Sequence, residues 1–127
     1  MEVVDVVLGI VVNDKGEILL QKKTNDYKNY PGQWNLFGGR AESDNMKNEM
    51  ERELKEEIGI EIPIKSLFDF ADDNARYHIF LSRLDNIEKV SIGEGAGVAF
   101  FSKEEIDKLK IIPGSSWAIK TFLRGSY

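Results

Sequence analysis

The sequence contains no cysteine and only one histidine and three prolines among its 127 residues. Without cysteine there can be no disulfide, no zinc–thiolate site and no cysteine nucleophile. The single histidine, His78, argues against a histidine-rich metal centre and against a catalytic triad that needs a histidine. Chemistry in this chain would therefore depend on carboxylates, whose oxygen atoms are the ligands that Mg²⁺ and Mn²⁺ prefer.

Long apolar runs and a positive net charge are also missing. The apolar stretch Val3–Val12 has about ten residues, half of what a membrane-spanning helix needs, and its many β-branched residues favour a buried strand. The formal net charge is −5, which argues against binding a nucleic-acid polymer because such binding needs a basic surface. We therefore expect a cytoplasmic protein that contacts neither membranes nor nucleic acid. A nucleotide remains open as a ligand, since a metal can neutralise its phosphates.

The rest of the composition predicts one domain over residues 1–127, because hydrophobic residues make up 42% and charged residues 31% of the chain. Strands and helices are expected to alternate irregularly, which predicts an α/β (α+β) fold, an α/β/α sandwich around a mixed sheet. The expected strands are Val3–Asn13, Glu17–Lys22, Trp34–Phe37, Ile60–Phe70, Tyr77–Arg83, Ile87–Ile92 and Val98–Phe101, and the expected helices are Asn45–Ile58, Lys103–Leu109 and Ser115–Leu123.

The helix expected at Asn45–Ile58 carries the most informative pattern. Glu53, Glu56 and Glu57 have the i, i+3, i+4 spacing that places three carboxylates on one helix face. Three acids on one face repel one another, so the arrangement is unfavourable unless a cation binds there. The spacing therefore predicts a site for a divalent metal ion, next to the apolar stripe through which the helix packs on the core.

Residues 38–60, GGRAESDNMKNEMERELKEEIGI, resemble the Nudix box. In that motif a glycine, five residues, a glutamate and seven residues precede Arg-Glu-aliphatic-x-Glu-Glu-x-Gly-aliphatic. The chain is thus similar to the Nudix hydrolase family and its MutT-like members. Asp44 stands at the one defined position that departs, where the family has glutamate. The matching residues are Gly38, Arg52, Glu53, Leu54, Glu56, Glu57, Gly59 and Ile60.

The resemblance implies a Nudix-type sandwich and a Mg²⁺-dependent enzyme, with Mn²⁺ as the alternative ion. Such an enzyme hydrolyses the pyrophosphate bond of a nucleoside diphosphate linked to a further group X. The small size is similar to that of members acting on nucleoside triphosphates, so a nucleoside triphosphate is the first expected substrate. A nucleotide-sugar or ADP-ribose pyrophosphatase and a non-catalytic nucleotide-sensing module remain as alternatives, and both a monomer and a homodimer remain open.

The resemblance also implies roles for individual residues. Glu56 and Glu57 are expected to bind the metal, and Glu53 to act as a ligand or as the general base. Arg52 is expected to orient that base, with an ordinary helix salt bridge as the alternative. The carbonyl oxygen of Gly38 is a further expected ligand. Glu94, in a glycine-rich loop, is expected to act as ligand or base, or else is an exposed loop acid.

The loop before the helix departs from the family pattern Gly-Gly-x-x-Glu-x-Gly-Glu. When Gly38, Gly39 and Glu42 are aligned with this pattern, the loop of this chain is one residue shorter. It has Ser43 and then Asp44, and the second glycine position of the pattern is missing. Glu49 stands near a position where the family usually has a small residue, and we expect it to point to solvent. The aromatic residues Trp34, Phe37, Tyr77 and Phe80 are expected in the core, with a base-stacking surface as the alternative.

Overall fold

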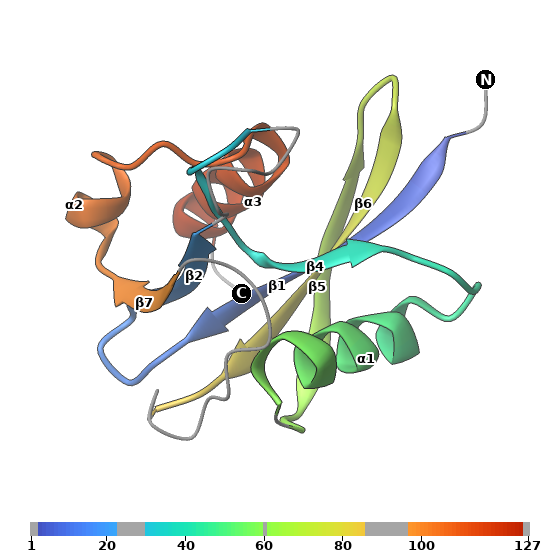
Figure 1. Ribbon diagram of the computed structural model, residues 1–127, viewed down its shortest axis with the longest axis horizontal. Coiled ribbons are helices and arrows are strands. Elements are labelled where there is room, and N and C mark those ends of the chain that lie inside the picture. Colours follow the sequence, from blue (N-terminus) through green and yellow to red (C-terminus); the bar gives the residue numbers. More distant parts are fainter. Residues whose placement is uncertain (1–2, 23–29, 60, 86–96, 126–127) are drawn as a thin grey trace.

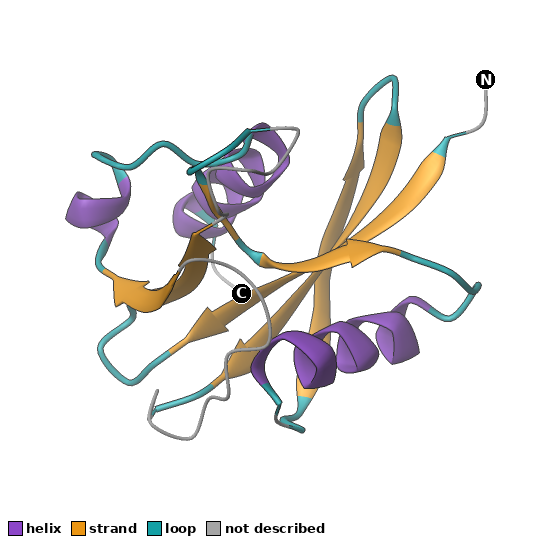
Figure 2. Cartoon of the chain, in the orientation of Figure 1, coloured by secondary structure: helices purple, strands orange, loops and turns teal. Residues whose placement is uncertain are grey.

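The structure, a computed structural model, describes residues 3–22, 30–59, 61–85 and 97–125. Within these residues a mixed sheet of seven strands forms the centre, and helices cover it from two sides (Figures 1 and 2). This arrangement agrees with the α+β sandwich expected from the sequence. In chain order the elements are β1 Val4–Val12, β2 Ile18–Lys22, β3 Trp34–Asn35, β4 Phe37–Arg40, α1 Met46–Ile58, β5 Ile64–Ala71, β6 Ala75–Arg83, β7 Gly97–Phe101, α2 Lys103–Ile106 and α3 Pro113–Arg124.

Strand β1 lies at the centre of the sheet. The strand order is β3-β2-β1-β6-β5, with β4 paired to β1 and β7 paired to β2 outside this path. The β1–β6 pairing is parallel and the others are antiparallel, so the sheet is mixed. The almost continuous apolar sequence of β1 fits this place, because a strand covered on both faces needs apolar residues on both.

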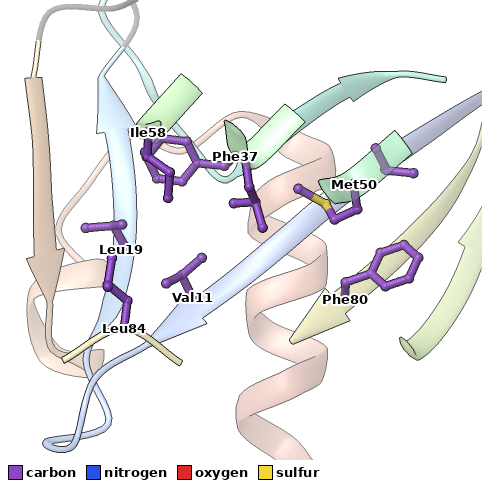
Figure 3. Close-up of a cluster of buried hydrophobic side chains, with 9 residues drawn as sticks. Val11, Leu19, Phe37, Met50, Ile58, Phe80 and Leu84 are labelled. Carbon is purple, nitrogen blue, oxygen red and sulfur yellow. The ribbon is translucent and has the colours of Figure 1, made fainter. Parts of the chain in front are cut away.

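Alternating residues of the strands divide the core into two layers. Val7 and Val11 of β1 face α1, whereas Leu8 and Ile10 face α3. Figure 3 shows the layer under α1, in which Met50 and Ile58 meet side chains of the sheet. Full burial of each such side chain contributes about 1.5–3 kcal/mol, so α1 is held firmly against the sheet. The buried residues of this layer are Val7, Val11, Leu19, Phe37, Met50, Leu54, Ile58, Phe80 and Leu84.

Several expected boundaries were wrong. The last helix begins at Pro113 and not after it, because proline suits the first turn, where its missing N–H is not needed. Strand β5 begins only at Ile64, after Pro63, which has no N–H to offer the sheet. The helix expected at Lys103–Leu109 is α-helical only to Ile106. The strand expected at Ile87–Ile92 lies outside the described residues. None of the described helices is long and apolar enough to span a membrane.

Candidate metal-binding and catalytic site

Helix α1 presents the acidic residues, and local signals at both of its ends fix its position. The side chain of Asn45 accepts a hydrogen bond from the backbone N–H of Asn48 at 3.1 Å, which caps the first turn. Gly59 ends the helix in the left-handed conformation, with a φ of 72°. The apolar stripe of Met50 and Leu54 packs on the sheet, so the neighbouring acidic face lies at the edge of the core.

Strand β4 brings two glycines against this acidic face. The sequence predicted that the strand would end before Gly38, but β4 continues through Gly38 and Gly39 and pairs with β1. Gly38 has a φ of 145°, and a side chain there would overlap the carbonyl oxygen of Val7. At Gly39 a β-carbon would lie 2.9 Å from Glu53 Oε1. Gly39 therefore allows the Glu53 carboxylate to lie directly against the backbone of β4.

Glu53 is nearly buried, with 12% of its side chain exposed. Burial raises the pKa of its carboxyl group above the usual glutamate value, Arg52 opposes this shift, and the nearby Glu56 and Glu49 add to it. Its cationic partner is Arg52, whose Nη2 lies 3.2 Å from Glu53 Oε1. A carboxylate in this setting has a raised affinity for a proton or for a metal ion.

Glu57 points from the same helix toward the sheet. Its Oε2 accepts the backbone N–H of Gly38 at 2.9 Å, and its Oε1 accepts Gln21 Nε2 at 3.3 Å. Gln21 belongs to β2 and is 9% exposed. Sequence reasoning did not single out Gln21. The available signal was a polar residue within the otherwise apolar run of Ile18–Lys22, because buried polar side chains normally have a hydrogen-bonding partner.

Arg52 joins three carboxylates of α1. Its Nε lies 3.3 Å from Glu49 Oε2, and its Nη1 lies 3.0 and 3.1 Å from the two oxygens of Glu56. Together with Glu53 these residues form what we call the Arg52 cluster: Glu49, Arg52, Glu53 and Glu56. Hydrogen bonds to Glu49 and Glu56 raise the pKa of Arg52 above its usual range, so the guanidinium remains charged. It makes an i, i+4 salt bridge to Glu56 and also contacts Glu53.

The expectation that Glu49 points to solvent was wrong. Only 6% of the residue is exposed, and it faces the loop between β4 and α1. Its Oε1 accepts the backbone N–H groups of Glu42 and Ser43, the latter at 3.2 Å. The Glu42 N–H and the Arg52 guanidinium lower the pKa of Glu49, which keeps it ionised. Asp44, by contrast, is exposed.

The sequence model of the NUDIX domain matches residues 3–122, which is nearly the whole chain. The chain belongs to the NUDIX domain family. An uncharacterized Nudix hydrolase from Listeria innocua is 28% identical over 114 residues, covering 79% of this chain and 64% of that protein. The nucleoside triphosphatase NudI from Enterobacter sp. (strain 638) is 36% identical over 66 residues, covering 50% of this chain and 47% of its own length. The chain thus spans about half to two thirds of these relatives.

Two solved structures share the Nudix fold closely. A MutT structure from work on Aliivibrio salmonicida and Vibrio cholerae has a TM-score of 0.78 at 22% identity, covering 94% of this chain and 96% of that chain. The NUDIX domain of Shewanella oneidensis NrtR, solved with ADP ribose, has a TM-score of 0.81 at 14% identity, covering 98% and 88%. At these identities the likeness concerns the fold, which is the expected Nudix sandwich.

The Nudix-box carboxylates have the donor chemistry that suits Mg²⁺ or Mn²⁺. Among the described residues, no three carboxylate or histidine side chains are already gathered as a metal-ligand set. Glu53 and Glu56 share Arg52, and Glu57 is bonded to Gly38 and Gln21. A carboxylate has about four acceptor positions, so the bonds to Arg52 leave oxygen lone pairs on Glu53 and Glu56 for an ion. The oxygen donors of these acids, of which Glu53 is nearly buried and Glu56 is exposed, therefore fit a divalent cation. Glu94 lies outside the described residues.

A separate cavity of about 410 Å³ lies on the other face of the Nudix sheet, beside the first turn of α3. Four aromatic side chains line it: Tyr30, Phe70, Tyr77 and Trp117. Phe70 and Tyr77 are stacked with ring centres 4.6 Å apart, and Phe70 lies 3.9 Å from Trp117, which is half exposed. Asp72 and Asn74 add polar groups at the same cavity. Tyr77, which the sequence assigned to the core, is thus partly available to a ligand.

Proposed function

We propose that this chain is a Nudix pyrophosphohydrolase that hydrolyses a nucleoside triphosphate with the help of Mg²⁺. The observation that carries the proposal is the setting of Glu53. Its carboxylate is nearly buried against Gly39, has a raised pKa, and lies in one cluster with Arg52 and Glu56. A purely structural acidic helix would turn the Glu53 carboxylate to solvent. The family match and the NudI relatives support the same reaction class.

In the proposed reaction, Glu56 and Glu57 would hold the divalent ion, with the carbonyl oxygen of Gly38 as a further candidate ligand and Glu53 as a ligand or the base. When bound, the ion neutralises phosphate charge and lowers the pKa of a water molecule. Glu53 receives the proton of the attacking water, because its raised pKa makes it a stronger base than an ordinary glutamate. Arg52 keeps Glu53 directed toward β4. Glu94 stays a proposed ligand or base.

The aromatic cavity supports a nucleoside as the group that is recognised. A nucleobase presents flat faces that stack on aromatic side chains, which the pair Phe70–Tyr77 and the half-exposed Trp117 supply. Tyr77 pairs with Val6 of β1, and Val6 pairs in turn with Arg40 of β4. Directly paired residues project to the same face of a sheet, so Arg40 projects toward the face that carries this cavity. We propose that it contacts the phosphates.

A hydrolysis screen tests the proposal. Purified protein would be offered nucleoside triphosphates, nucleotide sugars, ADP-ribose and dinucleoside polyphosphates with Mg²⁺, and products would be separated by chromatography. We expect a nucleoside monophosphate and pyrophosphate from a triphosphate, with all turnover lost in EDTA. Preferred cleavage of ADP-ribose or a nucleotide sugar would replace the substrate assignment, and failure of every substrate despite metal binding would favour a sensing module.

Matched variants test the residue roles in the same screen. Glu53→Gln and Glu57→Gln should each lower turnover by about 10²–10⁴-fold, the usual contribution of a general base or of a metal-activated nucleophile. Glu51→Gln is the control, because Glu51 is an exposed acid on the same helix. Near-normal turnover of a folded Glu53→Gln or Glu57→Gln protein would remove that residue from the mechanism. The cytoplasmic location and the choice between monomer and homodimer stay predictions.

A further inference from the structure

Glu49 is the member of the Arg52 cluster that the Nudix box does not define. It is 6% exposed, yet its carboxylate is ionised, so the free-energy cost of burying it must be offset by hydrogen bonds. Three donors provide them. The backbone N–H groups of Glu42 and Ser43 bond to Oε1, and Arg52 Nε bonds to Oε2. One carboxylate thus joins two separate parts of the site.

The first part is the loop between β4 and α1. This loop is one residue shorter than the usual family pattern and has Asp44, which is exposed, in place of the usual glutamate. The loop instead obtains its anchor from the helix, because Glu49 binds two consecutive backbone N–H groups. The same loop begins after Arg40, the residue that follows Gly39, and the Glu53 carboxylate lies against Gly39. Its position therefore affects the surroundings of Glu53.

The second part is the guanidinium of Arg52. Arginine presents its N–H groups in a rigid planar fork, so fixing one edge fixes the others. Glu49 takes Nε, and this leaves Nη1 for Glu56 and Nη2 for Glu53. Without Glu49, the fork could rotate about its long flexible stem, and the two remaining carboxylates would be held less firmly.

We propose that Glu49 is a positioning residue that anchors both the β4–α1 loop and Arg52, and thereby sets the directions of Glu53 and Glu56. In this chain it takes the place of the loop residues that depart from the usual motif. The inference rests on the divalent-metal site of the proposed function, although Glu49 itself touches neither metal nor substrate in it.

The geometry can be tested without any substrate. Metal-free wild type, Glu49→Gln, Glu49→Ala and the control Glu51→Ala would be compared by NMR. We expect the Glu42 and Ser43 amides to exchange with solvent at least about tenfold faster in Glu49→Ala, because their acceptor is gone. Glu49→Gln keeps a carbonyl oxygen for these amides but loses the charge that holds Arg52. It should therefore protect the loop better than alanine does.

The positioning role is tested by Mn²⁺ binding, measured by calorimetry on the same four proteins. Residues that orient metal ligands typically change affinity by about 10–100-fold when removed, and we expect a loss of this size in Glu49→Ala. Glu49→Gln should lie between alanine and wild type, and Glu51→Ala should match wild type. The proposal is overturned if folded Glu49→Ala or Glu49→Gln binds Mn²⁺ as tightly as Glu51→Ala, or if thermal unfolding shows that weaker binding follows the unfolded fraction.

Turnover then separates this inference from the proposed function. If wild type hydrolyses no nucleotide but Glu49→Ala still loses Mn²⁺ affinity and loop protection, Glu49 positions a metal site whose reaction was assigned wrongly. If wild type is active and folded Glu49→Ala has the same kcat, KM and Mg²⁺ requirement, the positioning role is wrong and the proposed function stands.

Discussion

At the scale of single residues, the neighbouring glycines of β4 are needed for different reasons. Gly38 adopts a φ of 145° and lies against the backbone of β1, where nothing can move aside. Gly39 has its close neighbour in the end of a side chain, the Glu53 carboxylate. A methyl group at Gly38 would thus disturb the fold, whereas one at Gly39 would disturb the site.

Gly39→Ala should therefore lower activity with little loss of stability. The added β-carbon would meet Glu53 Oε1 at 2.9 Å and push the carboxylate away from β4. Since displacing a metal-binding or basic group commonly costs about 10–100-fold, we expect kcat to fall by that amount. Steady-state kinetics and thermal unfolding would be measured together. Unchanged kcat in Gly39→Ala would mean that Glu53 does not act from the place it occupies here.

Gly38→Ala should instead lower the stability of the protein. The side chain would clash with the Val7 carbonyl oxygen in a conformation that residues with a side chain rarely adopt, which costs on the order of 3 kcal/mol. Urea unfolding would measure this loss. A stable Gly38→Ala protein would contradict the backbone geometry of β4.

At the scale of elements, α1 is specified by signals that lie close together in the sequence. Its cap, its apolar stripe and its terminal glycine all fall within residues 45–59, and the sequence predicted the helix and its stripe. The helix therefore presents its acidic face in a fixed direction. If α1 unfolded locally, all of the Nudix-box carboxylates that it carries would lose their fixed positions together.

Asn45→Ala should destabilise the protein by about 1 kcal/mol, because it removes the acceptor for the Asn48 N–H at the first turn. For a domain of this size the loss corresponds to a decrease in Tm of about 3–5 °C. Asn48→Ala is the matched control, since Asn48 takes part in this bond through its backbone only. Equal midpoints for the two variants in calorimetry would mean that the cap contributes nothing measurable.

At the scale of the whole molecule, clustered carboxylates make stability depend on protons and on cations. Glu53 has a raised pKa, so above pH 4.5 this residue binds a proton more readily in the folded metal-free protein than in the unfolded chain, and its contribution to stability falls with rising pH. Stability therefore falls as the pH rises from there through the raised pKa of Glu53. Glu49 has a lowered pKa, and its stabilising contribution is lost only as the pH falls below 4.5.

In EDTA, the free energy of unfolding of wild type relative to Glu53→Gln should therefore decrease as the pH rises above 4.5 through the raised pKa of Glu53. Urea unfolding at several pH values in this window would measure the difference. Adding Mg²⁺ at pH 7 should raise the stability of wild type more than that of Glu53→Gln, because ligands that bind only the folded state stabilise it. A difference that stays constant with pH would show that Glu53 titrates normally.

The sequence predicted those parts of the fold and site that depend on local spacing. The motif from Gly38 to Ile60 identified the family and the residues near Glu53, because helix periodicity fixes which side chains share a face. Gln21 and Glu49 were missed or misplaced, since their partners lie in other elements or in a loop of unusual length. The sheet pairing of Gly38 was missed for a similar reason, because it depends on the approach of β1.

The parallel pairing of β1 and β6 has a consequence for how fast the chain can fold. Val4 lies opposite Ala75 and Val12 opposite Arg83, which separates the partners by 71 positions in each case. The chain between these strands, which includes β4 and α1, must fold back on itself before β1 and β6 can pair. Domains dominated by such distant contacts fold in roughly milliseconds to seconds, and helical bundles fold in microseconds to milliseconds. The newly made chain therefore passes through a period in which the apolar strand β1 lacks its long partner.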